Sequence, residues 1–539
     1  MIANTVRLTG RLLPAVLAAT LLAGCTSGAS TEAAAPGPGA SPSASPSTSP
    51  TPEPSPTPTP KPTGEADPGL KPFYGQQITW SACADDPKTA KADESTAQCA
   101  RLRVPLDYAA PGGEVIELAL ARRQTAQEGR RIGHLLLNPG GPGSSGVSMV
   151  AARGTEFGKD GLRESYDLVG FDPRGVGAST AVHCMDDRAR DEFDSTDVRD
   201  GTRGKAMADA CQANSGKLLP HVGTRDAARD LDVLRGALGE PKLNYLGFSY
   251  GTYLGSRYIE QFPDKVGRVV LDGAVDSTLS QLDHAVQQNI SFEKALNAFA
   301  ADCVKQKGCS LGKDPEKAAG KLAAFLDGLK KEPLTTSSGR KLTASSAWIG
   351  TLSMLYGNAT SWEYLRNAVA WAMLRDKGDY LLAMADDYYR RGEDGKHTNM
   401  LDAYTAIHCA DPGADVPTEA RLAAAKQKLR DEAPLISARY TDEDLFDPDC
   451  RSWPYRTSEQ PGPTKSNGAP PVLVVGTTGD PATPYAWAEQ LTAQLGNATL
   501  LTREGEGHLG YNRSKCTFTA VNTFLTTGTL PPPGTRCTD

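Results

Sequence analysis

Residues 243–262 read LNYLGFSYGTYLGSRYIEQF. The first six are mostly apolar, as in a buried strand, and from Tyr250 onward the apolar residues recur at helical spacing. Between the two lies Gly247-Phe248-Ser249-Tyr250-Gly251, a GxSxG sequence. In this setting the serine lies on a sharp turn that exposes its hydroxyl, and glycines on both sides avoid collisions with neighbouring backbone. We therefore expect Ser249 to be a nucleophile; the alternative is a serine in an ordinary loop.

Short apolar runs alternate with helical patterns on both sides of this stretch. Strands are predicted at 134–138, 166–172, 243–249, 267–273, 471–480 and 498–508, and helices at 224–239 and 250–262. The segment GEVIELALARR (113–123) alternates apolar and polar residues, which is typical of an antiparallel edge strand. Apolar strands that alternate with helices predict an α/β protein with a mostly parallel, doubly wound sheet.

The alternation stops between about 275 and 465, where Ala, Leu, Lys, Asp and aromatic residues recur at helical spacing. A chain of 539 residues exceeds an ordinary single core, so an insertion is expected. We interpret 275–465 as a helical cap inserted into the sheet domain. The expected division is a signal peptide (1–25), a stalk (26–68), the first part of the core (69–274), the cap (275–465) and the second part of the core (466–539).

A serine hydroxyl needs a base to take its proton and an acid to orient that base. With a serine on such a turn, the acid and then the histidine follow in the chain. Asp480 ends the predicted strand PVLVVGTTGD, and His508 ends ATLLTREGEGH. Both lie at carboxyl ends of strands, where open α/β sheets build their sites. His508 is the only histidine after Asp480, so we predict that these two complete a triad with Ser249.

The loop Asn138-Pro139-Gly140-Gly141-Pro142-Gly143 follows the strand at 134–138. Its glycines allow backbone N–H groups to face the site, and a tetrahedral intermediate needs such donors for its oxyanion. We expect the N–H groups of Gly141 and Tyr250 to form this hole. A phosphate cradle is the alternative, but neither GxxxxGK[ST] nor GxGxxG occurs.

The N-terminal residues have the features of an export signal. Arg7 and Arg11 precede the apolar run 12–22, which is too short to span a bilayer. The run ends in Leu-Ala-Gly-Cys25, which resembles a bacterial lipobox, so we expect Cys25 to be lipidated; an ordinary secretory signal is the alternative. Residues 31–63 are rich in Pro, Ser, Thr and Ala, which predicts an extended stalk. The enzyme should then be extracellular, secreted or anchored to the bacterial cell membrane by lipid alone.

Ten cysteines remain after Cys25, an even number that suits an oxidising compartment. Spacing alone does not fix their connectivity. Joining sequence neighbours gives Cys83–Cys99, Cys184–Cys211, Cys303–Cys309, Cys409–Cys450 and Cys516–Cys537. No cysteine or histidine cluster has zinc spacing, so neither a metal nor another cofactor is expected. The formal charge of −7 gives no basic surface for nucleic acid, and the sequence does not indicate an oligomeric state.

Six segments carry a resemblance to a known family: NPGGPGSSG, VGFDPRGVGAS, GFSYGTYLG, AIHCADP, TTGDPATP and GEGH. In this order, over about residues 75–539, they are similar to the secreted tripeptidyl aminopeptidase and proline iminopeptidase branch of the α/β-hydrolases. The resemblance implies an α/β-hydrolase fold with a helical cap and a serine exopeptidase that acts on peptides with a free N-terminus. It also implies that Ser249, Asp480 and His508 are the triad, with Gly141 and Tyr250 at the oxyanion. Asn138-Pro139 stands where the smaller proline iminopeptidases have His-Gly-Gly, which favours the tripeptidyl branch.

An aminopeptidase must bind the substrate's ammonium group, and a buried carboxylate in the cap suits this need. The candidates are Glu363, Asp386, Asp387, Asp402 and Asp411, and the sequence does not choose among them. In FDPRG, Asp172 and Arg174 are expected to form an internal ion pair rather than to bind substrate, and Cys409 to be bonded rather than nucleophilic. An esterase or lipase with the same triad and a non-catalytic peptide-binding lipoprotein remain alternatives.

Overall fold

The computed structural model describes residues 64–538, apart from 86–96, 126–127, 154–156, 158–160, 196–201, 414–416, 440–449, 451 and 458. The predicted signal peptide, Cys25 and most of the predicted stalk lie outside the described residues. In the part of the chain that is described, no helix is long and apolar enough to cross a membrane.

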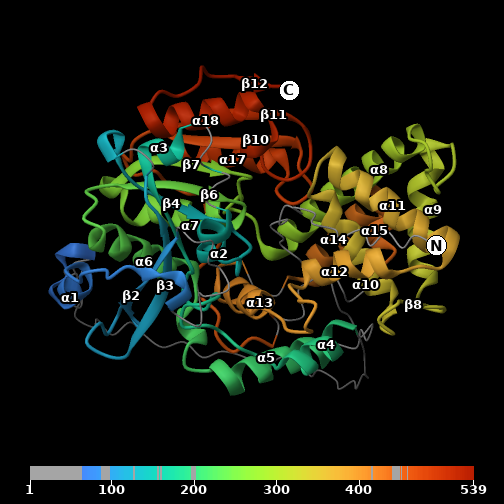
Figure 1. The fold of residues 1–539 in the computed structure, drawn as a ribbon, viewed down its shortest axis with the longest axis horizontal. Coiled ribbons are helices and arrows are strands. Elements are labelled where there is room, and N and C mark those ends of the chain that lie inside the picture. The colour runs from blue at the N-terminus through green and yellow to red at the C-terminus, as the bar shows by residue number, and fades with distance from the viewer. Residues whose placement is uncertain are drawn as a thin grey trace, which may run out of the picture.

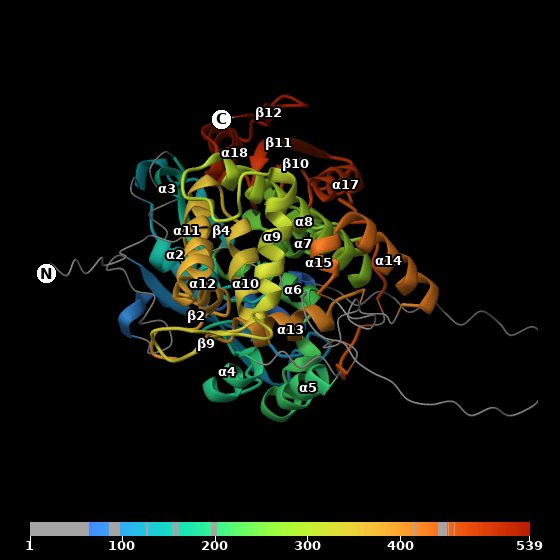
Figure 2. The same cartoon turned by 90° about the vertical axis from the view of Figure 1, so that its right-hand side faces the viewer.

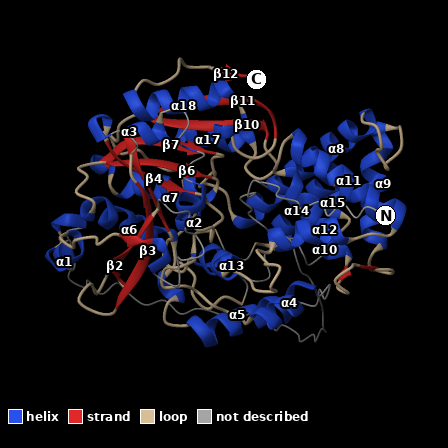
Figure 3. Ribbon diagram, in the orientation of Figure 1, coloured by secondary structure: helices blue, strands red, loops and turns tan. Residues whose placement is uncertain are grey.

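A ten-stranded sheet forms the centre of the molecule (Figure 3), in the order β1-β2-β3-β5-β4-β6-β7-β10-β11-β12. Its strands are β1 (Ser81–Ala82), β2 (Gln98–Pro105), β3 (Val115–Arg123), β4 (Gly133–Asn138), β5 (Tyr166–Phe171), β6 (Leu243–Phe248), β7 (Val266–Asp272), β10 (Val472–Gly479), β11 (Ala498–Glu506) and β12 (Arg536–Cys537). The pairs that involve β1, β2 and β3 are antiparallel, and all others are parallel. The predicted α/β-hydrolase architecture is confirmed. The strand β2 was not among the strands expected.

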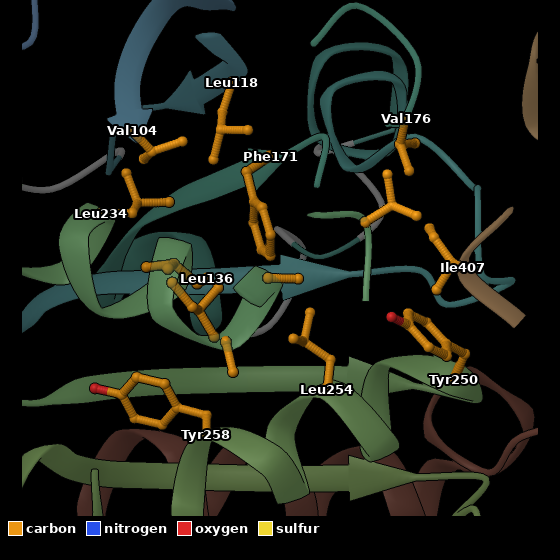
Figure 4. Close-up of a cluster of buried hydrophobic side chains, with 14 of the residues drawn as sticks. Val104, Leu118, Leu136, Phe171, Val176, Leu234, Tyr250, Leu254, Tyr258 and Ile407 are labelled. Carbon is orange, nitrogen blue, oxygen red and sulfur yellow. The ribbon is translucent and has the colours of Figure 1, made fainter. Parts of the chain in front are cut away.

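Helices cover both faces of the sheet because its strands are apolar on both sides. Leu136 packs in one hydrophobic cluster and its neighbours Leu135 and Leu137 in another. The first cluster contains residues of α6 (Thr224–Ala237), α7 (Tyr250–Gln261) and α17 (Tyr485–Leu495), and the second contains residues of α2 (Gly146–Arg153) and α18 (Lys515–Thr527). Figure 4 shows Leu136 beside Leu254 and Tyr258 of α7.

A separate group of helices lies beside the sheet (Figures 1 and 2). It comprises α8 (Gln281–Lys305), α9 (Pro315–Gly328), α10 (Ala344–Leu355), α11 (Ala359–Arg375), α12 (Asp379–Tyr388), α14 (Glu419–Glu432) and α15 (Pro434–Ser437). Most of them share a hydrophobic cluster of their own, around Phe299, Trp348 and Leu381. The helix α13 (Met400–Ala410) is different, because its Ile407 packs in the cluster of the sheet near Tyr250 (Figure 4). The boundaries at 275 and 465 therefore stay a prediction, because one helix of this stretch belongs to the core of the sheet.

All five cysteine pairs expected from sequence order are bonded in the structure. The bridge between Cys409 and Cys450 joins the end of α13 to the segment before Trp453. Cys409 is therefore not available as a nucleophile. The bridge between Cys184 and Cys211 fastens α5 (Thr202–Ser215) to the loop that follows β5.

The predicted ion pair within FDPRG is wrong. Arg174 is fully buried and donates two hydrogen bonds, each 2.7 Å long, to Asp230 of α6. Asp172 instead accepts from the Ser145 hydroxyl and from the backbone N–H groups of Val147 and Ala178. Both residues brace the loop after β5, but Arg174 pairs with a residue 56 positions away, and Asp172 binds N–H and hydroxyl groups on both sides of it in the sequence.

Candidate active site

Ser249 lies at the turn between β6 and α7, with φ 54° and ψ −125°. This left-handed conformation is strained for a residue with a side chain and is typical of functional turns. A hydrogen bond of 2.8 Å from its N–H to the carbonyl oxygen of Asp272 ties the turn to β7. A side chain at Gly247 would approach the Gly251 carbonyl oxygen to 2.5 Å. Both glycines are therefore needed for the tightness of this turn.

Asp480 and His508 are in contact at the ends of β10 and β11, which are neighbouring parallel strands. The Nδ1 atom of His508 lies 2.9 Å from each carboxylate oxygen of Asp480. The carboxylate also accepts hydrogen bonds from the N–H groups of Ala482, Thr483 and Leu509 and from the Thr483 hydroxyl. These donors hold the carboxylate in one orientation.

The helical cap reaches His508 directly. The His508 N–H donates to the carbonyl oxygen of Tyr356, at the end of α10, over 2.9 Å, and the Tyr356 ring lies edge-on to the imidazole at 5.3 Å. With Nδ1 occupied by Asp480, Nε2 is buried and has no hydrogen-bond partner among the described residues. Nε2 is thus available as a base. No hydrogen bond joins it to Ser249 in this structure, and such contacts commonly tighten only when substrate binds.

The loop after β4 lies directly against the nucleophile turn. A Cβ atom at Gly140, whose φ is +91°, would lie 2.3 Å from the Phe248 carbonyl oxygen and 3.1 Å from the Tyr250 nitrogen. Only glycine permits this approach. The N–H groups of Gly141 and Tyr250 donate to no described residue, and Tyr250 is the first residue of α7, where N–H groups lack intrahelical partners. Both are therefore free to bind an oxyanion.

Ser249 opens onto a cavity of about 100 Å³ between the sheet and the cap. Its lining includes Gly141, Tyr250 and Thr483, so the predicted oxyanion donors and a neighbour of His508 meet at this one space. Ser249, Asp480 and His508 are 2–3% exposed. The structure thus gathers all the predicted catalytic groups at the carboxyl edge of adjacent strands.

Of the five candidate carboxylates, only Asp411 lines this cavity. Glu363 is exposed on α11. Asp386 is paired with Arg340, at 2.6 and 2.8 Å, and Asp387 is 53% exposed beside Arg390. Asp402 is buried in an ion pair with Arg190 and accepts from the Cys184 N–H. None of these four carboxylates lines the cavity, and Asp386, Asp387 and Asp402 are each paired with an arginine.

Asp411 follows α13 and accepts hydrogen bonds from the N–H and the hydroxyl of Thr224. Burial raises its pKa to about 6, so it is ionised at neutral pH. Two further polar atoms line the same cavity. The Oε1 atom of Gln281 and the Nδ1 atom of His284 are buried and have no partner among the described residues. Burial lowers the pKa of His284 to about 3, so its ring is neutral. Asp276 also lines the cavity, and its carboxylate accepts hydrogen bonds from Thr278 and from the side-chain amide of Gln494. The cavity therefore combines two carboxylates with the unpaired carbonyl oxygen of Gln281.

Asp272, at the end of β7, is a supporting residue that sequence reasoning missed. Its carboxylate accepts hydrogen bonds from the N–H groups of Gly510 and Tyr511, at 2.9 and 2.8 Å, and its carbonyl oxygen holds the Ser249 N–H. It thus connects the nucleophile turn to the loop after His508. Burial raises its pKa to about 6. The only sequence signal was its position at a strand end, as in LDG (271–273). Among the described residues, no group of three potential ligands forms a metal site.

The chain is similar to several proteins named as hydrolases. Residues 433–537 match the family model described as TAP-like protein. Serine protease Hip1 of Mycobacterium tuberculosis is 37% identical over 486 residues, which cover 87% of this chain and 92% of that protein. Carboxylesterase B of the same species is also 37% identical, over 86% of this chain and 91% of the relative. Tripeptidyl aminopeptidase of Streptomyces coelicolor is 32% identical over 84% of each chain.

These relatives extend over nearly the whole length of the chain and include enzymes named for peptide and for ester hydrolysis. The match therefore covers both the sheet and the inserted helices. The chain belongs to the tripeptidyl aminopeptidase-like branch of the α/β-hydrolase family and is a serine hydrolase.

Proposed function

We propose that this enzyme is an extracellular serine exopeptidase that hydrolyses peptide bonds near a free N-terminus, in the manner of a tripeptidyl aminopeptidase. Its catalytic residues are Ser249, His508 and Asp480. The observation that carries the proposal is the cavity beside Ser249, which combines the ionised Asp411 with the unpaired acceptor Gln281 Oε1. An ammonium group has three donors and a positive charge. An ammonium group therefore fits the acceptors of this cavity, whereas an acyl chain or an uncharged alcohol does not require a carboxylate.

The reaction begins when Ser249 Oγ attacks the scissile carbonyl and His508 Nε2 takes the hydroxyl proton. Negative charge then develops on the carbonyl oxygen, which the N–H groups of Gly141 and Tyr250 stabilise. The imidazolium gives its proton to the leaving amine as the C–N bond breaks, and an ester on Ser249 remains. Water hydrolyses this ester with the same base. Asp480 holds the imidazole in the tautomer that leaves Nε2 unprotonated at the start.

A matched set of substrates tests the proposal. One peptide sequence is offered as an amide with a free N-terminus and as its N-acetylated form, beside a simple ester. We expect the free peptide to be cleaved at least a hundredfold better than the acetylated one, because the acetyl group removes a charge that Asp411 pairs with. Equal cleavage of both peptides would overturn the exopeptidase proposal. Efficient cleavage of acetylated peptides only when lysine precedes the scissile bond would assign Asp411 to a cationic side chain instead.

The length of the released fragment needs its own panel of mono-, di- and tripeptidyl reporters. The cavity of about 100 Å³ is smaller than the roughly 150 Å³ cavity that holds a benzene molecule. A tripeptide must therefore extend beyond it. Preference for the tripeptidyl reporter supports the tripeptidyl assignment, and preference for a single proline supports a proline iminopeptidase.

An esterase or lipase is the second candidate, since the triad serves either reaction. A larger, mostly apolar cavity favours it, because this cavity is lined by chain neighbours of the reactive groups, Phe248 and Leu509. Ester turnover far above amide turnover, with no effect of N-acetylation, would select it. A non-catalytic lipoprotein would fail to react with a fluorophosphonate.

We propose that the mature chain begins at a lipidated Cys25 and that residues 26–68 act as a stalk. The apolar run before Cys25, the proline-rich composition and the five disulfides of the described part support export to an oxidising compartment. Cys25→Ser should release the enzyme from the membrane, or block its maturation, with no change in its catalytic constants. An unmodified N-terminus elsewhere, found by mass analysis of the mature protein, would refute this.

A further inference from the structure

We propose that a second and larger cavity, of about 850 Å³, binds the part of the peptide that follows the scissile bond. It selects apolar residues there and favours peptides that end in a nearby carboxylate. This inference rests on the proposed peptidase function and adds a binding site for the leaving fragment.

The two cavities lie on opposite sides of the oxyanion loop. Gly141 and Pro142 line the small cavity, whereas Pro139, Gly143 and Ser144 line the large one. The nucleophile turn and α13 each contribute residues to both cavities. Ser249 and Tyr404 face the small cavity, and Phe248 and Met400 face the large one. No lining residue is shared. A peptide whose scissile carbonyl lies at Ser249 thus has one space on each side.

The residues after His508 line the large cavity, namely Leu509, Tyr511 and Arg513. His508 must pass its proton to the leaving nitrogen, so the leaving fragment departs on the side of the imidazole. The walls there are largely apolar, with Val147, Phe157 and Phe248 among them. Burying an apolar side chain against such walls is favourable in proportion to its area.

The charges of the two cavities have opposite sign. The large cavity is lined by Arg513 and by Arg390, which forms an ion pair with Asp387 at 3.6 Å. Its one carboxylate, Asp172, is fully buried and already accepts three hydrogen bonds. Arg513 donates to the Tyr356 carbonyl oxygen at 3.2 Å, and among the described residues no carboxylate lies within salt-bridge distance of it.

The small cavity, by contrast, holds Asp411. A peptide has its ammonium at one end and its carboxylate at the other. The charges therefore orient it with the N-terminus in the small cavity and the C-terminal part in the large one.

The test varies only the leaving fragment of free-N-terminus peptides. Phenylalanine or leucine just after the scissile bond is compared with serine, and a C-terminal acid is compared with its amide. We expect wild-type enzyme to prefer the apolar residue and to cleave the acid about tenfold better than the amide, as for a charge-assisted hydrogen bond. Equal rates within each pair would overturn the proposal. Because the N-terminus is constant, this outcome is distinct from failure of the free-versus-acetylated comparison.

Two variants locate the effect. In Arg513→Gln, the peptide with a C-terminal acid should be cleaved no faster than the peptide with a C-terminal amide. Arg513→Lys should retain part of the preference for the acid. Ser148→Phe places a ring in the large cavity from an exposed position of α2, and should abolish the preference for apolar residues. The control is Arg188→Gln, whose side chain is 86% exposed on α4 (Asp187–Ser195). Unchanged preferences in both Arg513→Gln and Ser148→Phe would refute the assignment of this cavity.

Discussion

Replacing Asp411 by asparagine removes one of the two carboxylates that line the small cavity and little else. The amide oxygen can still accept from the Thr224 N–H, which Asp411 binds at 2.7 Å. Removing one partner of a buried ion pair costs about 3–5 kcal/mol. Because Asp411 is only partly buried, we take the lower end, about 3 kcal/mol. At 1.36 kcal/mol per tenfold, kcat/KM for a free-N-terminus peptide should fall roughly 100-fold.

The assay compares kcat/KM for this peptide with kcat/KM for a small acetate ester that has no ammonium group. The Asp411→Asn enzyme should lose activity on the peptide alone, mainly through KM. Asp387→Asn is the matched control, because Asp387 is a cap carboxylate with a side chain that is 53% exposed. If Asp411→Asn cleaved the peptide within threefold of wild type, or lost both activities equally, the assignment of the ammonium site would be wrong.

Asp480→Asn should lower kcat about 10⁴-fold, because an amide favours the wrong imidazole tautomer; steady-state kinetics with near-normal activity would exclude this carboxylate as the orienting acid. Gly140→Ala should lower kcat about 10²–10³-fold, as for loss of an oxyanion donor, whereas Gly239→Ala, also at positive φ but with no atom within 4 Å of the added carbon, should leave kcat unchanged; equal kcat values in the two variants would contradict the role of Gly140. As pH falls through about 6, Asp411 takes up a proton and KM for free-N-terminus peptides should rise. The same raised pKa contributes stability that is fully present below about 3.8 and lost as pH rises through about 6, so the loss of activity should occur without unfolding by circular dichroism.

Apolar runs and helical spacing in the sequence were sufficient to predict the alternating strands and helices of the sheet domain. The strands that end at Phe248, Gly479 and Glu506 agree with the predicted runs to within two residues, because a buried parallel strand is a continuous apolar run. The turn at Ser249 was predictable because glycines stand on both sides of it, where a side chain would collide with neighbouring backbone. Asp480 and His508 were predictable because the acid and then the histidine follow such a serine in the chain, each at the end of a strand.

Contacts between distant segments could not be predicted in this way. The pairing of Arg174 with Asp230 joins residues 56 positions apart, and no local feature distinguishes Asp230 from other acidic residues of its helix. The choice of Asp411 among five carboxylates depends on how α13 packs against the sheet. The support that Asp272 gives to two loops depends on backbone N–H groups, which have no sequence signature.

We propose that Ser249 forms an acyl-enzyme with a peptide that has a free N-terminus. The most direct test is rapid acid quenching during turnover of a free-N-terminus peptidyl ester, followed by peptide mapping by mass spectrometry. We predict an adduct of the peptidyl group on Ser249, and its absence from Ser249→Ala, whose turnover of the amide should fall at least about 10⁴-fold. An adduct on another residue, or amide turnover by Ser249→Ala within tenfold of wild type, would contradict the account.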